Sequence, residues 1–535
     1  MTVPAGLRDR TKKMISVLYR PRVIIGVVIW YASLILYTVT MAPDVLAHDP
    51  GEWQAAGFTL GIAHAPGSPA YIIIAKLFTL LPFGLPATRV TFVSVVMGAT
   101  GVVSTYAFML LLFNRLLPAL VSAATLAVAA IWWGQSVVAT PYNAVPTMMA
   151  TLLILLLLWS RSGNVRLLWG GALLAGLGLA YHPLLMFFLP VLLAGIFLLG
   201  PWRTLLKPGP LLILVLMLMA GLSVYLYLPI CSAADPPILY QKIDSLSTFY
   251  NFVSASHARE TKLRDSILPG LSEVGERLDE VVYQSYYPFS AYLMIGPVIV
   301  LLLPAVWTRL RRLRRWLLFL VMGMVVHIFT IFVLSDIYNH YYLPMLFYFA
   351  IWAGFAAYLI ITICEVYISR KWLKQFSVLA TGAFYITVLA LGLSNTWVFA
   401  NHGGDRGMRE YINTVFRQAR PGAVVLANWE SYTGLLYAQK IEGQRPDVFL
   451  YAVPVPIPKE LWFSIKAEHP SSQVLIARSF NVMNESDAKL YGAWQPLSIK
   501  GGTYQDFKHG KPYPVAAKVF DERTEAEKYL ASNQE

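Results

Sequence analysis

Residues 23–42 read VIIGVVIWYASLILYTVTMA, and residues 43–53 continue as PDVLAHDPGEW. The first segment carries no charge, and a helix needs about 20 mostly apolar residues to cross a bilayer. The segment is too long for the apolar part of a cleaved signal peptide, which spans roughly 7–15 residues. We therefore expect a retained first transmembrane helix, followed by an acidic loop on the far side of a membrane.

The rest of the sequence repeats this alternation of apolar runs and polar loops. Of its 535 residues, 57% are hydrophobic and 13% are charged, whereas soluble domains carry about 25% charged residues. The sequence predicts an α-helical polytopic membrane protein with about eleven transmembrane helices. The expected spans are 23–42, 88–113, 117–134, 143–159, 167–181, 184–199, 210–229, 290–308, 316–334, 341–363 and 376–394. The stretch 71–81 is too short to cross upright, so we expect it to be re-entrant or interfacial.

The distribution of charge predicts the orientation. If the N-terminus is cytoplasmic and the spans alternate, the inside loops before residue 401 hold 19 Lys and Arg against two acidic residues, and the outside loops hold 7 against 12. Cytoplasmic loops are enriched in Lys and Arg, so we expect an inner (cell) membrane protein with an extracytoplasmic C-terminus. The net charge of +13 lies in these short loops, which argues against a nucleic-acid partner. Cys231 and Cys364 fall at opposite faces of this topology and should be free thiols.

Three outside segments are longer than simple connections require, at 43–87, at 229–289 and from residue 395 onward. An amphipathic pattern at 272–282 predicts helical structure in the second of them. In the third, the runs 423–427 and 447–451 have the composition of buried strands, and 431–440 between them fits a helix. We therefore expect a transmembrane domain over 1–394 and a small extracytoplasmic α/β domain of parallel βαβ type over 395–535.

The first outside loop concentrates groups that are suited to acid–base chemistry. It holds Asp49, Glu52 and His64 beside the expected membrane surface. A carboxylate there could deprotonate an acceptor hydroxyl or hold a divalent cation, so Asp49 and Glu52 are the candidate catalytic residues and, if a metal binds, its ligands. The same residues also fit a capping box, with Asp49 as the N-cap, Pro50 at N1 and Glu52 at N3. The two interpretations are compatible, because a helix start holds a carboxylate rigidly.

Several cationic side chains near the expected outer face form a second group of candidates. A cation at this depth could bind a lipid-linked phosphate, or it could serve equally as an interfacial anchor or a headgroup contact. The candidates for substrate binding are His64, Arg89, His257, Arg259, Lys262 and His340.

The segments 49–52 (DPGE) and 60–69 (LGIAHAPGSP) together resemble the signature of a widespread membrane-protein family that was first named as a domain of unknown function. That family is related to a eukaryotic protein O-mannosyltransferase and belongs to the GT-C glycosyltransferase superfamily. Pro50 and Ala65 replace the Ser and Pro of the family pattern, and both changes spare the ionisable residues. Weaker similarities follow in order at 227–237, 336–344 and 437–448, where Cys231 replaces a usual Arg, so no role is carried over to that position.

The resemblance implies a GT-C architecture with a catalytic acid in the first outside loop. It also implies a donor sugar on a polyprenyl phosphate at the outer leaflet, and transfer with inversion to a hydroxyl of a protein, lipid or glycan, with protein O-mannosylation among the options. On this hypothesis Asp49 activates the acceptor hydroxyl, and Glu52 assists through a cation or by hydrogen bonding. The basic residues hold the donor phosphate and should face the base across a cavity.

Two other functions fit a polytopic protein with an acidic outer loop, namely a transporter or flippase of lipid-linked sugars and a non-catalytic envelope assembly factor. Transporters usually place ionisable residues at mid-membrane, on broken helices related by repeats. Here the carboxylates lie in an outside loop, and the sequence has no internal repeat. The surroundings of Asp49 distinguish the three functions: a cavity open to the outer leaflet favours the enzyme, a central tunnel favours transport, and a filled site favours the assembly factor.

Overall fold

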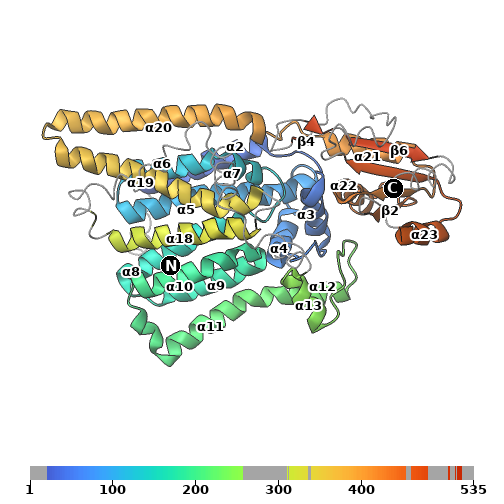
Figure 1. Cartoon of the computed structure of the whole chain (residues 1–535), viewed down its shortest axis with the longest axis horizontal. Coiled ribbons are helices and arrows are strands. Elements are labelled where there is room, and N and C mark those ends of the chain that lie inside the picture. Colours follow the sequence, from blue (N-terminus) through green and yellow to red (C-terminus); the bar gives the residue numbers. More distant parts are fainter. Residues whose placement is uncertain are drawn as a thin grey trace, which may run out of the picture.

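The computed structural model describes residues 21–256, 310, 313–334, 339–453, 459–479, 504–505, 512–513 and 515–520. These residues form a bundle of apolar helices, with a smaller α/β unit packed against one of its ends (Figure 1). The bundle begins with α2 (Pro21–Thr40), and the chain passes into the α/β unit after α20 (Lys371–Ala400). Helix α20 therefore continues past residue 394, where the sequence predicts the domain boundary.

The helices of the bundle follow the apolar runs of the sequence. They are α2, α3 (His48–Thr59), α4 (Pro69–Phe78), α5 (Pro86–Phe113), α6 (Leu116–Ala127), α7 (Ala130–Ser136), α8 (Ala144–Ser162), α9 (Arg166–Tyr181), α10 (Leu189–Leu199), α11 (Pro208–Leu222), α12 (Tyr227–Ala233), α13 (Leu246–Val253), α18 (Arg314–Leu334), α19 (Leu343–Tyr367) and α20. Short 3-10 segments join some of them, at η1 (Pro183–Phe188), η2 (Trp202–Leu206), η3 (Ser223–Leu226) and η4 (Asn339–Tyr342). Proline in the first turn of α4, α5, α11 and α19 favours these starts, because its fixed φ suits a helix and its missing N–H would have no helical partner there.

Six of the described helical segments are long and apolar enough to cross a membrane, and the pair α6 and α7, bent by 65°, gives a seventh if it counts as one span. This confirms a polytopic α-helical membrane protein. The number of about eleven spans stays a prediction, because the helices at Arg166–Tyr181 and Pro183–Leu199 are shorter and the expected span 290–308 lies outside the described residues. The amphipathic stretch 272–282 lies outside them as well.

The bundle has a central helix and peripheral helices. In the apolar window of α19, 83% of the residues are buried inside the protein, against 12% for α20 and 11% for the segment that contains α11. The exposed apolar side chains of α11 and α20 therefore require lipid around them, whereas α19 packs among other helices and forms the core of the bundle. Most of the segment 71–81 lies in the short helix α4, which packs on α3 and α5; a re-entrant or interfacial position stays a prediction.

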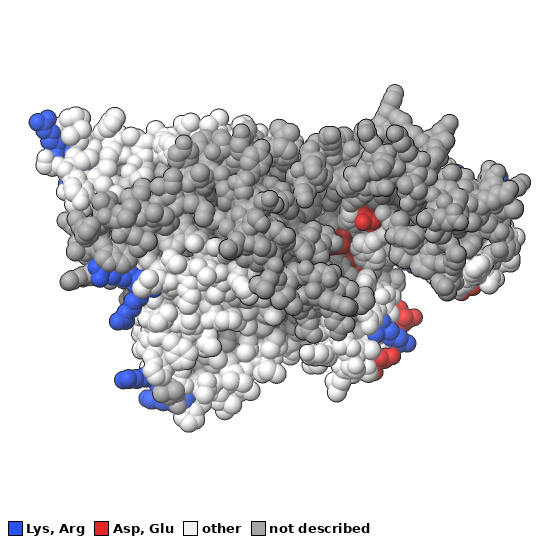
Figure 2. All heavy atoms as spheres, in the orientation of Figure 1, with Lys and Arg blue, Asp and Glu red and all other residues white. Residues whose placement is uncertain are grey.

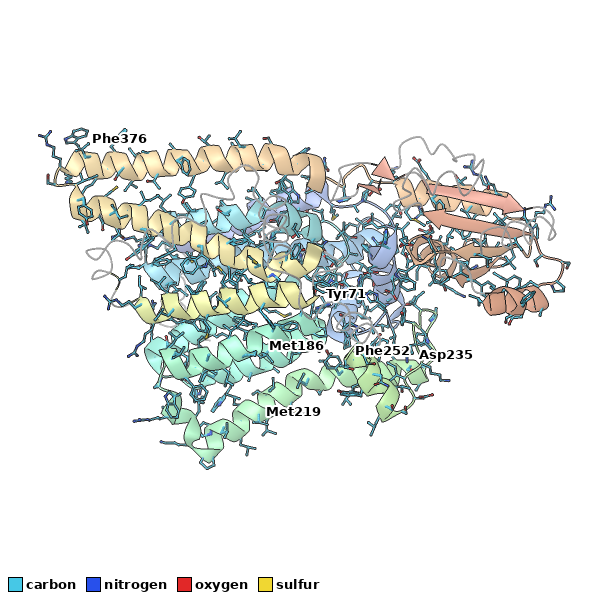
Figure 3. All side chains as sticks on the ribbon, in the orientation of Figure 1. Tyr71, Met186, Met219, Asp235, Phe252 and Phe376 are labelled. Atoms are coloured by element: carbon cyan, nitrogen blue, oxygen red, sulfur yellow. The ribbon has the colours of Figure 1, made fainter. Side chains whose placement is uncertain are left out.

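Charge separates along the bundle as the topology argument expects. Most of the visible Lys and Arg gather at the end where α20 begins, and acidic side chains lie near the α/β unit (Figure 2). Phe376, near the start of α20, and Asp235, after α12, mark these opposite ends (Figure 3). At the basic end Arg115 forms a bidentate ion pair with Glu365, at 2.7 and 2.8 Å. Which end faces the cytoplasm stays a prediction.

The α/β unit contains a four-stranded sheet with the order β2-β1-β3-β6. Its strands are β1 (Val424–Ala427), β2 (Phe449–Ala452), β3 (Val474–Ser479) and β6 (Val515–Phe520), and its helices are α21 (Gly407–Gln418), α22 (Trp429–Lys440) and α23 (Lys459–Glu468); β4 (Tyr504–Gln505) and β5 (Pro512–Tyr513) form a separate pair. Strand β1 pairs in parallel with β2 and β3, and β6 is antiparallel to β3. Helix α22 connects β1 to β2, which is the parallel βαβ unit that the sequence predicts over 423–451.

The α/β unit and the first outside loop share one apolar core. Trp53 and Tyr71 from the loop belong to the same buried cluster as Tyr411, Leu435 and Tyr437 from α21 and α22. A polar contact adds to it, because the backbone N–H of Ala87 donates to the Tyr437 hydroxyl at 3.1 Å. The acidic loop is therefore held between the helix bundle and the α/β unit.

Candidate active site

Helix α3 carries the two carboxylates, and its start differs from the predicted capping box. The N-cap is Ala47, and no side chain caps the helix. Asp49 lies inside the first turn, and Glu52 accepts its hydrogen bonds from His64. The capping interpretation is therefore wrong for both carboxylates. The local spacing permits the box, but a partner twelve residues along the chain offers Glu52 both a backbone N–H and a ring nitrogen.

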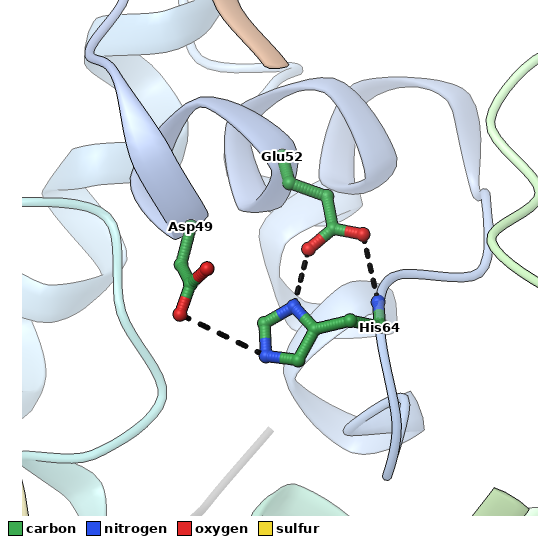
Figure 4. Close-up of side chains that lie close together, drawn as sticks. All are labelled: Asp49, Glu52 and His64. Carbon is green, nitrogen blue, oxygen red and sulfur yellow. Dashed lines mark hydrogen bonds and ion pairs between the residues drawn. The ribbon is translucent and has the colours of Figure 1, made fainter. Parts of the chain in front are cut away.

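Glu52 and His64 form a buried pair (Figure 4). The Glu52 side chain is 3% exposed. One of its oxygens accepts from the backbone N–H of His64 at 2.7 Å, and the other lies in a short hydrogen bond with Nδ1 of the ring. Both oxygens of Glu52 are thus engaged by one residue, which fixes the position and the orientation of the imidazole.

The electrostatics of the pair favour a protonated histidine. Burial alone would lower the pKa of His64, but Glu52 and Asp49 raise it to about 9. Burial raises the pKa of Glu52, and the positive charge of His64 opposes that rise. At neutral pH we therefore expect a histidinium between two carboxylates, since an opposite charge in contact favours the charged form.

Asp49 is the more accessible of the two carboxylates. Its side chain is 32% exposed, and its Oδ2 lies 3.8 Å from Nε2 of His64. Its Oδ1 accepts a hydrogen bond of 3.1 Å from the indole N–H of Trp429, the first residue of α22. A substrate hydroxyl can reach Asp49 more readily than the buried Glu52, so Asp49 is the better placed of the two for the predicted role of a base.

The turn that presents His64 packs against the second outside segment. The N–H of Ile62 donates to the carbonyl of Ile238 at 2.8 Å, and the N–H of Tyr240 donates back to the carbonyl of Ile62 at 2.9 Å. A Cβ on Gly61 would overlap the carbonyl oxygen of Ile238, so this close approach requires glycine.

The Sγ–H of Cys231, where the family pattern has Arg, points to the carbonyl of Leu60 at 3.0 Å. Both Cys231 and Cys364 are free thiols, as expected.

Aromatic side chains from three parts of the chain surround His64. The ring of Trp53 lies 5.0 Å from the imidazole, that of Tyr240 lies 6.3 Å away and that of Trp429 lies 6.4 Å away, all measured between centroids. Tyr240 is 51% exposed, so this wall has an open side. Sequence reasoning missed Trp429 and Tyr240, because no local pattern distinguishes either from an ordinary interfacial or core aromatic residue.

The structure places the predicted substrate-binding residues differently. The guanidinium of Arg89 donates to the carbonyls of Thr79, Phe83 and Gly84, so it stabilises the turn after α4, and a phosphate contact stays a prediction. His257, Arg259 and Lys262 lie outside the described residues, as does the side chain of His340 in η4. Within the described part of the chain, Asp49, Glu52 and His64 come together, and Arg89 does not bond to any of them.

The same three side chains also lie close enough together to hold a cation. One ligand atom from each of Asp49, Glu52 and His64 lies within 4.8 Å of the others. Carboxylate and imidazole suit several divalent metals. However, one oxygen of Glu52 already bonds to Nδ1 of His64 and the other accepts from the backbone N–H of His64, and a cation between the two side chains would have to displace the bond to Nδ1. Cation binding by Asp49 and Glu52 therefore stays a prediction.

Comparison with known proteins supports the resemblance read from the first loop. Residues 49–205 match the protein O-mannosyl-transferase TMEM260 N-terminal domain. Over 76 residues the chain is 38% identical to protein O-mannosyl-transferase TMEM260 of Mus musculus, a segment that covers 14% of this chain and 11% of the mouse protein. The chain thus spans only a small part of the length of that curated relative.

Two solved structures show the same fold over most of the chain. ArnT from Cupriavidus metallidurans, in a structure with undecaprenyl phosphate, aligns with a TM-score of 0.56 at 13% identity, over 94% of this chain and 98% of that one. An oligosaccharyltransferase of Archaeoglobus fulgidus, tethered to an acceptor peptide, aligns with a TM-score of 0.52 at 11% identity, over 85% and 69%. The chain is therefore a membrane protein with a GT-C-like fold, and its residues 49–205 match the protein O-mannosyl-transferase TMEM260 N-terminal domain.

Proposed function

We propose that the protein is a glycosyltransferase that moves a sugar from a polyprenyl-phosphate donor to an acceptor hydroxyl at the outer face of the membrane, with protein O-mannosylation as the first activity to test. The observation that carries the proposal is the accessible carboxylate of Asp49, which is fixed by Trp429 and lies 3.8 Å from the ring of His64. The match to the mannosyl-transferase domain begins at Asp49 itself. A structural relative binds undecaprenyl phosphate, which supports a lipid-linked donor.

The reaction needs a base and a leaving phosphate on opposite sides of the reacting carbon. In our proposal the acceptor hydroxyl donates its proton to Asp49, its oxygen forms the new bond to the anomeric carbon, and the bond from that carbon to the phosphate oxygen breaks. The polyprenyl phosphate leaves with the electron pair. Glu52 takes no proton from the acceptor, because it is buried; it holds His64 cationic beside the base.

The position of the site supports an enzyme over a transporter. Asp49 lies in the first turn of α3, at the end of the bundle where the α/β unit packs (Figure 1). Transporters usually bind substrate near mid-membrane. We propose that this end faces the outside and that Arg259 and Lys262 in the segment 229–289 contact the donor phosphate there. The inner membrane location and the extracytoplasmic tail belong to the same proposal.

The test is sugar transfer from polyprenyl-phosphate mannose to a peptide acceptor by the purified full-length protein. Replacing Asp49 by Asn keeps the size and the hydrogen-bond acceptor of the side chain but removes the base, so turnover should fall by roughly 10²–10⁴ with unchanged folding. Asp235→Asn is a matched control, because it makes the same chemical change at an exposed residue of the same end and should retain full turnover. Wild-type turnover in Asp49→Asn would exclude Asp49 as the base.

A further inference from the structure

The α/β unit reaches the candidate base through one face of α22. Trp429 donates its indole N–H to Oδ1 of Asp49 at 3.1 Å. One turn later Thr433 donates its hydroxyl to the backbone carbonyl of His48 at 2.8 Å. Residues four apart lie on the same side of a helix, so α22 holds both the backbone at the start of α3 and the side chain that follows it.

Trp429 is itself held in place. Its ring stacks on Tyr432 at 6.2 Å and meets the edge of Tyr240 at 5.6 Å. The register of α22 is set by Leu435 and Tyr437, both fully buried in the core shared with the first loop. A donor on a rigid element orients its acceptor better than a donor on a flexible side chain does. The indole N–H therefore points at one defined position of the carboxylate.

We propose that Trp429 is a positioning residue of the transferase site, so that the α/β unit completes the catalytic machinery instead of merely covering it. This inference rests on the proposed function of Asp49 as the base. The indole N–H engages Oδ1 and thereby turns Oδ2 toward His64, the side on which the acceptor proton is taken. In this proposal the indole acts through Asp49 and not directly on the donor or the reacting atoms.

A double-mutant cycle between positions 49 and 429 tests this assignment. Trp429→Phe keeps an aromatic ring against Tyr240 and Tyr432 but removes the N–H. We expect kcat to fall roughly 10- to 100-fold, the loss typical of a hydrogen bond to a charged group, with the KM for polyprenyl-phosphate mannose unchanged. In an Asp49→Ala background, which has no carboxylate to orient, Trp429→Phe should have no further effect. Trp372→Phe, at an exposed position near the start of α20, is the matched control and should retain wild-type kcat.

The same cycle can be measured by thermal unfolding of the wild type, the two single variants and the double variant. This measurement requires no sugar transfer. We expect Trp429→Phe to lower the unfolding midpoint of the wild type more than that of Asp49→Ala, because the bond exists only when both partners are present. Equal effects of Trp429→Phe in both backgrounds, on kcat and on the midpoint, would overturn the inference while leaving Asp49 as the base. Full turnover in Asp49→Asn would instead overturn the proposed function. Coupling between positions 49 and 429 in the unfolding midpoints would then still show that Trp429 bonds to Asp49.

Discussion

At the scale of single residues, the site places one histidine between two carboxylates, one of which is buried. Removing one partner of a buried ion pair leaves an uncompensated charge and costs about 3–5 kcal/mol. Glu52 satisfies both of its oxygens with His64, and the second ring nitrogen of His64 faces Asp49. One histidine therefore serves two carboxylates of different exposure, and the accessible one is the candidate base.

The raised pKa of His64 predicts a dependence of stability on pH. Its value rises from an ordinary 6.5 to about 9 in the folded protein, so folding favours the protonated ring. That contribution is complete below pH 6.5 and is lost as the pH rises through 9. We expect the thermal unfolding midpoint of the wild type to decrease as the pH is raised from 6.5 to 9. The midpoint of His64→Asn should decrease less. Parallel curves for the two proteins would show that His64 does not titrate in this window.

At the scale of elements, α3 is confined between the bundle and α22. Gly51 sits at a crowded position of α3: a Cβ there would overlap the carbonyl oxygen of Leu46 and lie 3.0 Å from Oγ1 of Thr433 in α22. The glycine in the DPGE segment is thus explained first by its own loop and then by a contact almost 400 residues away in sequence. It lets the helix that carries both carboxylates dock on the α/β unit.

Gly51→Ala should therefore displace the backbone at Leu46 from α3 and crowd Thr433 of α22. We expect a loss of roughly 1–3 kcal/mol in stability, as for other overpacked sites, together with reduced sugar transfer. Gly170→Ala in α9 is the matched control, because nothing lies within 4 Å of a Cβ at that position. There the change should be neutral or slightly stabilising, since alanine favours helix. Unfolding midpoints of the two variants decide the matter, and equal midpoints would argue against tight packing around Gly51.

At the scale of the whole molecule, the first outside loop connects the bundle to the α/β unit. Beyond the shared core, Arg409 of α21 bonds to both oxygens of Asp44, at 2.7 and 3.0 Å, and to both oxygens of Glu442, at 2.5 and 2.6 Å. Asp44 lies in the loop that leads into α3. Because that loop and the tail are bonded together, they must lie on the same side of the membrane.

The topology is tested by a reporter that is active only in the cytoplasm. Fused after Glu535 it should be silent, because the charge distribution predicts an extracytoplasmic tail. Fused after Arg203, in the expected inside loop between α10 and α11, it should be active. A strong signal from the C-terminal fusion would place the α/β unit, and with it Asp49, in the cytoplasm and would remove access to a donor at the outer leaflet.

The sequence by itself determined the membrane class, most helix positions, the βαβ unit and the acidic first loop. These features depend on composition and on periodicity within about 20 residues, which a single sequence displays directly. The DPGE and LGIAH segments also identified Asp49, Glu52 and His64 together, although the local spacing of the carboxylates suggested a capping box that does not form.

Only the tertiary structure decided the burial and the bonding partners of each of these residues. Glu52 is buried and bonded to His64, Asp49 is accessible, and Trp429 reaches Asp49 from the other end of the chain. Arg89 binds backbone carbonyls of its own neighbourhood. The burial and the bonding partners of a residue depend on which surfaces meet when the first loop packs between the bundle and α22. A contact between residues 49 and 429 produces no periodic pattern in a single sequence, so sequence analysis does not detect it.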